Sequence, residues 1–249
     1  TTLILTTIAI ILSHDDFQST KGEEQVSKVD MYELVDGSDL LAGSINSKRL
    51  NLTRATNADA QLAANFKNKK DFRAIEAAYS DISDNSMEYI YNWHAFSVIL
   101  TGTKVTDHGL ARLRRSQSVR YLAIDMMPNL TGRSIKILPS LSYLRVARIG
   151  NANLEDADLE PLRNCASLNE LIVNSSKRLT GKALDQLSKS VALQTIKIGG
   201  CPGISQADLN NFAARHPSIK ITASAIPIPA VSDGNFRQPG PSPLPDILD

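Results

Sequence analysis

Residues 98–113 read VILTGTKVTDHGLARL, and they contain the spacing that decides the fold. Val105 is followed by Leu110 five positions later and by Leu113 three positions after that. The same three-point apolar pattern occurs six times, at Ile82/Met87/Ile90, Val105/Leu110/Leu113, Leu130/Ile135/Leu138, Leu154/Leu159/Leu162, Leu179/Leu184/Leu187 and Ile204/Leu209/Phe212. Successive patterns start 23, 25, 24, 25 and 25 residues apart. Self-similarity at this period indicates stacked units that bury a core only together.

Each pattern predicts the start of a short helix. Leu110 and Leu113 fall on one stripe of a helix, and the residue after the first aliphatic position carries a hydroxyl in five of the six units. These expected N-caps are Ser83, Thr106, Thr131, Glu155, Thr180 and Ser205. An oxygen there accepts a hydrogen bond from an otherwise unpaired amide of the first turn. Asp84, Asp107 and Asp156 follow three of the caps and place a carboxylate at the positive end of the helix dipole.

A strand-like segment precedes each of these turns. Its pattern is apolar-x-x-apolar-x-apolar, and the last two apolar positions alternate as in a half-buried strand. The predicted strands are Phe72/Ile75/Ala77, Trp93/Phe96/Val98, Val119/Leu122/Ile124, Leu141/Leu144/Val146, Leu168/Leu171/Val173, Leu193/Ile196/Ile198 and a closing Ile219/Ile221. Strand, turn and helix repeated in parallel predict a curved α/β solenoid.

Residues 98–113 resemble a leucine-rich repeat whose turn reads V-T-D-x-G-L-x-x-L. Cys165 lies three residues before Leu168 and Cys201 three before Ile204, the positions at which the cysteine-containing subtype carries its cysteines. The resemblance extends over roughly residues 72–222. It implies a right-handed leucine-rich-repeat solenoid, a horseshoe of about six repeats with a concave parallel sheet and convex helices.

Composition and motifs argue against several classes of function. The chain has 249 residues, is 42% hydrophobic and carries a net charge of +1, so it shows no bias towards nucleic acid. Its two cysteines complete no CxxC or Cys/His cluster, which favours buried thiols over a disulfide or a zinc site. The sequence has no GxSxG, P-loop, GxGxxG or HExxH motif. We therefore expect no enzyme activity, cofactor or metal in this chain; any catalysis would belong to a domain outside it.

The chain divides into four predicted regions: 1–17, 18–71, 72–222 and 223–249. The first contains TTLILTTIAIIL, which is interpreted either as part of a transmembrane helix or as a buried strand or helix packed on the first repeat. The flank after it is poor in Lys and Arg, which favours an extracytoplasmic side if it is an anchor. Residues 18–71 are interpreted as an N-terminal cap with a rudimentary strand at Leu50–Leu52, and residues 223–249 as a disordered Pro-rich tail.

The binding surface is predicted on the concave face, because the residues between the inward strand positions point there. Tyr and Arg are enriched at binding hot spots, so Tyr121, Tyr143 and Arg145 are expected to be neighbours in this surface. The alternative is that these are ordinary solvated sheet positions. The candidate binding residues are Tyr121, Asp125, Tyr143, Arg145, Glu170, Ile172, Asn174 and Lys197.

These expectations favour a domain that binds a protein or peptide without turnover. A second hypothesis is the extracytoplasmic sensor region of a longer membrane protein, such as a bacterial receptor-type serine/threonine kinase. A third, implied by the cysteine-containing subtype, is a ubiquitin-ligase substrate adaptor, which ranks last because residues 13–71 do not look like an F-box.

Overall fold

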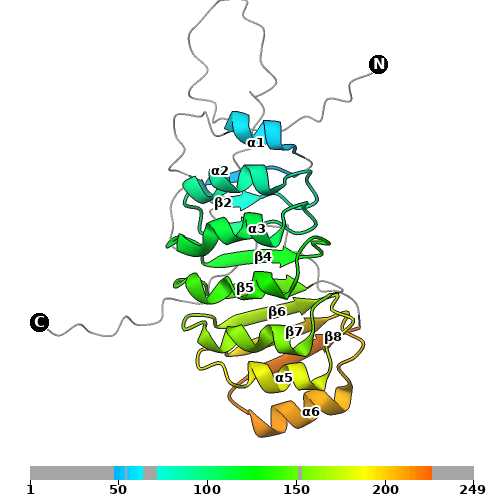
Figure 1. Cartoon of the computed structure of the whole chain (residues 1–249). Helices are drawn as coiled ribbons and strands as arrows, with labels where there is room; N and C mark the ends of the chain where they lie inside the picture. The colour runs from blue at the N-terminus through cyan, green and yellow to red at the C-terminus, as the bar shows by residue number, and fades with distance from the viewer. Residues whose placement is uncertain (1–47, 54, 64–71, 151–152, 226–249) are drawn as a thin grey trace, which may run out of the picture.

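A computed structural model describes residues 48–53, 55–63, 72–150 and 153–225. They form one parallel sheet of eight strands in the order β1 to β8, so every strand pairs with its neighbours in the sequence (Figure 1). The strands are β1 (Lys48–Asn51), β2 (Phe72–Glu76), β3 (Ser97–Ile99), β4 (Tyr121–Asp125), β5 (Val146–Gly150), β6 (Glu170–Asn174), β7 (Thr195–Gly199) and β8 (Lys220–Ser224).

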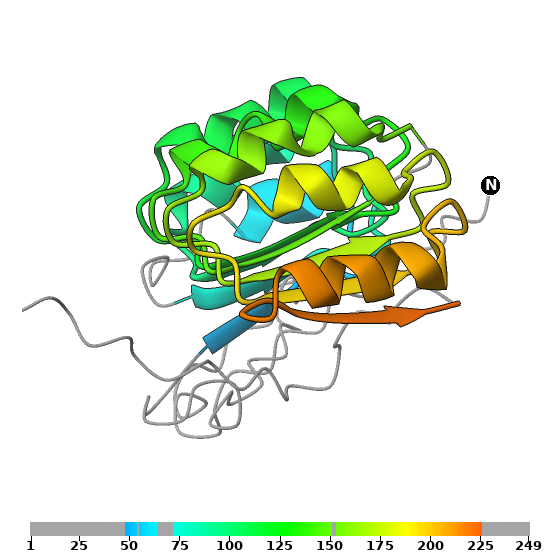
Figure 2. The same cartoon turned by 90° about the horizontal axis from the view of Figure 1, so that it is seen from below.

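Short helices connect the strands, and those of the described residues cover one face of the sheet (Figure 2). They are α1 (Asn57–Ala63), α2 (Met87–Asn92), α3 (Asp107–Leu110), α4 (Gly132–Ile135), α5 (Gly181–Leu187) and α6 (Gln206–Arg215), with the 3-10 helices η3 (Asp84–Ser86), η4 (Ala111–Arg115), η5 (Leu138–Ser140) and η6 (Asp156–Asn164). Parallel strands in sequence order with a helix in every crossover form an α/β leucine-rich-repeat solenoid, as predicted. We call the face opposite the helices the concave face.

The core is a stack of inward-facing strand residues in register. Leu122 pairs with Ala147, Ala147 with Leu171, and Leu171 with Ile196 on successive strands. Each of these four side chains is at most 1% exposed. On the other side of the core, the helices contribute the apolar residues of the three-point pattern, which pack against these strand residues. Every residue of that pattern is buried except Ile204, which is half-buried against the core. The predicted period and its apolar positions are therefore confirmed.

All six predicted N-caps begin a helix. The side chains of Thr106, Thr131, Thr180 and Ser205 each accept a hydrogen bond from a backbone amide of the first turn. Glu155 forms a reciprocal capping box with Asp158. Ser83 is also an N-cap, but its side chain makes no capping hydrogen bond.

The aspartates after the caps have a role that the sequence did not reveal. Asp107 accepts from the backbone amide of Thr131 at 3.0 Å and from its hydroxyl at 2.6 Å, so one carboxylate caps the helix of the next repeat. Asp84 binds Thr106 in the same way, and Asp156 binds Thr180. These contacts join consecutive helices along the stack.

Glycine replaces this aspartate at two positions, and there the next repeat caps itself. Gly132 lies in the repeat before the one in which Asp158 forms a capping box with Glu155. Gly181 lies in the repeat before the one in which Asp208 forms a capping box with Ser205. A Cβ on Gly132 would lie 1.8 Å from Asp158 Oδ1, and one on Gly181 would lie 2.4 Å from Asp208 Oδ1. Hydrogen bonds from the Ser205 hydroxyl and amide lower the pKa of Asp208. A side chain in place of either glycine would therefore collide with the aspartate that caps the next repeat, so only one of the two capping arrangements fits at each site.

Three predicted strand registers are wrong. Val98, rather than Phe96, pairs with Ile75, and Ala147, rather than Leu144, pairs with Leu122. In β8, Ile221 rather than Ile219 pairs with Ile196. For β5 the reason is that Leu141/Leu144/Val146 and Leu144/Ala147/Ile149 fit the apolar pattern equally well. Burial of both Ala147 and Ile149 against the helices selects the second set.

The predicted cap region is described only in part. Its rudimentary strand at Leu50 belongs to β1, which pairs in parallel with β2, and α1 follows it. The apolar segment 1–17 and the tail beyond residue 225 lie outside the described residues. Within the described ranges, no helix combines the length and apolarity that crossing a membrane requires.

Both cysteines are buried free thiols, and Cys201 donates weakly to the Gly199 carbonyl at 3.5 Å. Burial raises the pKa of Cys165 to about 12, and burial also raises the pKa of Cys201. Since the thiolate is the reactive species, iodoacetamide at pH 8.5 should leave both cysteines unmodified in the native chain and label both in denaturant. Mass spectrometry of the labelled chain measures this, and rapid labelling of either cysteine without denaturant would contradict it.

Leu184 is fully buried on the helix side of the core. Leu184→Ala should lower the free energy of unfolding by about 2 to 5 kcal/mol, because it removes buried methyl groups and leaves a cavity between repeats. Val191→Ala is the matched control, since Val191 is 88% exposed and should change stability by less than about 0.5 kcal/mol. Denaturant titration measures both, and equal effects would refute the burial described.

Candidate binding surface

The concave face presents three rows of residues, two of which run from β2 to β8 and one from β4 to β8. The first row is Ala74, Ser97, Tyr121, Val146, Glu170, Thr195 and Lys220; the second is Glu76, Ile99, Ala123, Arg148, Ile172, Lys197 and Thr222; the third is Asp125, Gly150, Asn174, Gly199 and Ser224. Parallel strands lie about 4.8 Å apart, so neighbours within a row are in side-chain contact range.

Most of the predicted binding residues lie on this face, but two do not. Tyr121, Asp125, Glu170, Ile172, Asn174 and Lys197 occupy the three rows as expected. Tyr143 and Arg145 precede β5, so the expectation that they flank Tyr121 in the sheet is wrong. Tyr143 is exposed and Arg145 half-buried in the connection before the strand.

Arg148 occupies the position expected for Arg145, and the sequence contained a signal for it. The interval from the last apolar helix position to the first apolar strand position is six residues in three units, from Leu113 to Val119, Leu162 to Leu168 and Leu187 to Leu193. The same interval from Leu138 ends at Leu144 and places Arg148 on the concave face.

A buried polar network joins four consecutive repeats at the carboxyl edge of the sheet. Asp125 Oδ1 accepts from the Thr101 hydroxyl at 2.7 Å. Asp125 Oδ2 accepts from Arg148 Nε at 2.7 Å and from Asn174 Nδ2 at 3.0 Å. Asp125 is fully buried and Arg148 is 2% exposed. Several donors around one carboxylate compensate for its loss of water, and they fix the Arg148 side chain on the sheet.

An apolar cluster lies beside this network. Tyr121, Ala123 and Val146 are buried together, and Ile99 packs against them. Burial raises the pKa of the Tyr121 phenol to about 12. Ile172 continues the second row next to Arg148 and is also buried.

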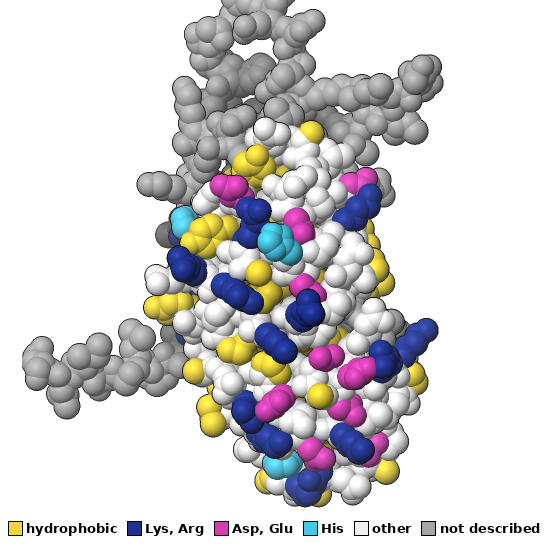
Figure 3. Space-filling view, viewed as in Figure 1, with side chains coloured by type: hydrophobic (Ala, Val, Ile, Leu, Met, Phe, Trp, Pro, Cys, Tyr) yellow, Lys and Arg dark blue, Asp and Glu magenta, His cyan; other side chains and the backbone are white. Residues whose placement is uncertain are grey.

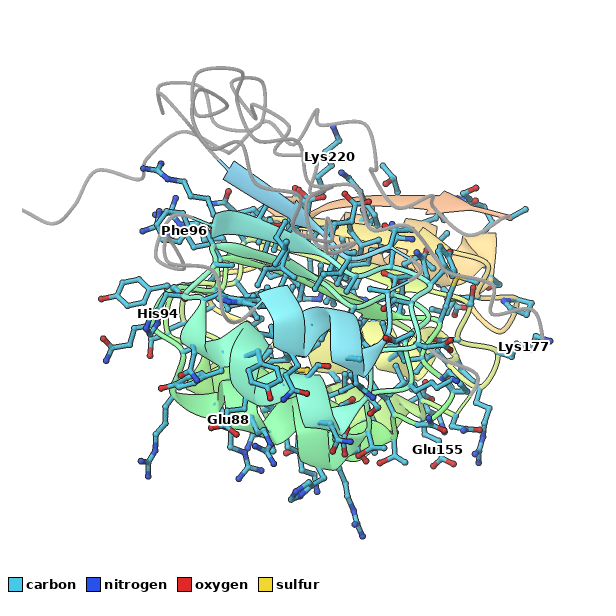
Figure 4. The ribbon with its side chains drawn as sticks, turned by 90° about the horizontal axis from the view of Figure 1, so that it is seen from above. Glu88, His94, Phe96, Glu155, Lys177 and Lys220 are labelled. Carbon is cyan, nitrogen blue, oxygen red and sulfur yellow. The ribbon has the colours of Figure 1, made fainter. Side chains whose placement is uncertain are left out.

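Accessible polar groups flank the buried middle. On the later strands, Lys197 Nζ lies 2.6 Å from Glu170 Oε1, with 40% and 25% of the side chains exposed. Towards β3, the Arg120 guanidinium lies 4.6 Å from the centre of the Phe96 ring and that of Arg73 lies 5.8 Å from it. Figure 4 shows Phe96 and Lys220 on the sheet side of the molecule, with Glu88 and Glu155 on the helix side.

The helix side has a different character. Figure 3 shows Lys, Arg, Asp and Glu side chains of both signs interspersed over it. Exposed ion pairs such as Arg112 with Glu88 and Arg215 with Asp185 account for part of this pattern. A polar hollow of about 420 Å³ lies between α5 and α6, but its Arg215 and Asp185 already pair with each other. No group of three His, Cys, Asp or Glu within the described ranges could hold a metal ion.

No protein-family model and no curated protein matches the sequence. Among solved structures, internalin C2 from Listeria monocytogenes is similar at 22% identity and a TM-score of 0.43, with 64% of each chain covered. The TLR13–ssRNA13 complex is similar at 13% identity and a TM-score of 0.26, over 72% of this chain and 35% of that one. This chain therefore spans less than two thirds of the length of either. Both neighbours are leucine-rich-repeat proteins, the fold that the parallel sheet and its helical crossovers define here.

Asp125→Asn should lower the free energy of unfolding by about 3 to 5 kcal/mol, because it removes the carboxylate charge that pairs with the buried Arg148 guanidinium. Asp81→Asn is the matched control. It breaks an ion pair with Lys104 in which both side chains are 65% exposed, and should change stability by less than about 1 kcal/mol. Arg148→Met combined with Asp125→Asn should recover part of the loss. Chemical denaturation compares the variants, and similar effects of the two Asp→Asn changes would contradict the network.

Proposed function

We propose that this chain is a non-catalytic binding domain that recognises a protein or peptide on the concave face of its sheet. The observation that supports the proposal most directly is the alignment, in register, of an apolar cluster with polar groups on both sides of it. Tyr121, Val146 and Ile172 form the apolar middle, and the Glu170–Lys197 pair lies beside it. Hot spots of protein interfaces have this composition, with a desolvated aromatic or aliphatic centre inside a polar rim.

The charge of the concave face favours a polypeptide partner. In the middle of the face Arg148 pairs with Asp125 and Lys197 with Glu170, and Arg73, Arg120 and Arg145 lie near the amino ends of their strands. Nucleic acids require several unpaired cationic groups along a phosphate backbone. An extended polypeptide matches the face better, because its side chains repeat at a spacing similar to that of the rows.

The sensor and adaptor hypotheses both place this same domain in a longer protein. Each would use the concave face for its ligand, and attachment of Thr1–Leu12 to a membrane is a separate proposal. Arg148 replaces Arg145 in the proposed binding surface because of the corrected register of β5.

Peptides selected from a random library on the full chain provide the test. Lys197→Glu and Ile172→Ala should each weaken their binding at least about tenfold, since hot-spot truncations cost more than about 1.4 kcal/mol. Fluorescence polarisation measures the dissociation constants, and thermal unfolding checks that each variant is folded.

The matched controls reverse charge on the helix side. Arg112 and Lys182 are exposed there, and Arg112→Glu and Lys182→Glu should leave the dissociation constants within about twofold. Loss of binding in these controls, with binding retained in Lys197→Glu, would refute the concave-face proposal.

A further inference from the structure

The residues directly before the first row of the concave face form a further row at the amino ends of the strands. Its members at β2 to β5 are Arg73, Phe96, Arg120 and Arg145, and we call these four residues the basic row. Backbone hydrogen bonds keep them in register. The amide of Phe96 donates to the Arg73 carbonyl at 2.8 Å, that of Arg120 to Phe96 at 2.7 Å, and that of Arg145 to Arg120 at 2.8 Å. Neighbours in the basic row are therefore about 4.8 Å apart along the backbone.

The Phe96 ring, on the sheet side of the molecule (Figure 4), holds two guanidinium groups together. Cζ of Arg120 lies 4.6 Å from the ring centre and Cζ of Arg73 lies 5.8 Å from it. A cation over an aromatic face is attracted by the ring, and a stacked guanidinium keeps the N–H groups at its edge for hydrogen bonds. All four residues of the basic row are half-buried, so they are partly desolvated but remain accessible.

Arg120 and Arg145 carry charges that no carboxylate of the described residues neutralises by an ion pair. Acidic residues in the adjacent rows already have partners there, as Asp125 has in Arg148. Two such charges on adjacent strands, with Arg73 on the other side of Phe96, create a positive potential at this end of the concave face. This part of the surface therefore favours an anionic ligand.

The length of the basic row restricts the kind of anion. On β6 and β7 the same position is occupied by the uncharged residues Asn169 and Gln194. The charges thus extend over three strand spacings, about 14 Å, which is the length of about four residues of an extended polypeptide. Nucleic acids need a longer series of cations along the phosphate backbone. A short run of acidic side chains has the required length, and carboxylates match the planar fork of arginine.

We propose that the basic row binds a short run of Asp and Glu residues within the polypeptide ligand of the concave face. This inference rests on the proposed function and specifies the chemistry of its ligand. The Arg120 and Arg145 guanidinium groups donate hydrogen bonds to the carboxylates, and Phe96 positions Arg120. Because Arg120 precedes Tyr121 and Arg145 precedes Val146, the acidic run lies beside the apolar part of the proposed binding surface.

Fluorescein-labelled octaglutamate is the probe, and fluorescence polarisation measures its binding to the full chain. The ionic strength is about 0.15 M, at which charges farther away than about 8 Å are largely screened. Arg120→Gln with Arg145→Gln should weaken binding at least about tenfold, since the charge-assisted hydrogen bonds of two guanidinium groups are lost. Arg145→Gln alone should weaken it at least about threefold, and it leaves the contact between Arg120 and Phe96 in place.

The matched control removes two arginines from the helix side. Arg114→Gln with Arg115→Gln makes the same change in net charge at two exposed positions of η4, and should leave the dissociation constant within about twofold. Octalysine and a single-stranded oligothymidylate of the same length are the comparison probes. Each should bind the unsubstituted chain at least about tenfold more weakly than octaglutamate does. Thermal unfolding checks that every variant is folded.

The proposal is overturned if the unsubstituted chain does not bind octaglutamate, or if both double variants bind it equally tightly. It is also overturned if the oligothymidylate binds as tightly as octaglutamate, which would identify a phosphate-binding surface. The proposed function is tested separately, with library peptides and changes at Ile172 and Lys197. Library peptides that depend on those two positions but contain no acidic run would refute this inference and leave the proposed function intact.

Discussion

Each strand-and-helix unit can cover its own apolar side chains only by stacking on the next unit, and the rest of the structure depends on this constraint. Leu122, Ala147 and Leu171 form one continuous buried row because their strands are parallel and in register. The same register places one residue of every repeat in each row of the opposite face. The concave surface is therefore a direct consequence of core packing, and its composition is set one repeat at a time.

The helix layer is held to the same register by carboxylates. Where the residue after the N-cap is aspartate, as at Asp107, it binds the N-cap of the next repeat. Where it is glycine, as at Gly132, the next repeat uses its own aspartate, which occupies the space that a side chain would need. Both arrangements satisfy the first-turn amides, so the stack remains rigid beneath the concave face.

The concave face combines a fixed polar network with an apolar cluster, and these have different roles. Asp125 is saturated by Thr101, Arg148 and Asn174, so its contribution is to hold the sheet edge and the guanidinium in place. Tyr121 and Val146 belong to the apolar part of the proposed binding surface.

The sequence alone determined the repeat period, the apolar core positions and the six helix starts, because these depend on local spacing and on hydroxyl groups next to it. It also identified Tyr121, Ile172 and Lys197 as residues of the concave face. The apolar pattern alone could not fix the register of β3 or β5, since it fits two alignments in each. For β5, the six-residue interval from Leu138 to Leu144 and the burial of Ala147 and Ile149 select one of them. Tertiary structure alone decided that Arg148 pairs with Asp125 and that Asp107 caps a different repeat. Each of these is a contact between residues of different repeats or segments, which no local pattern encodes.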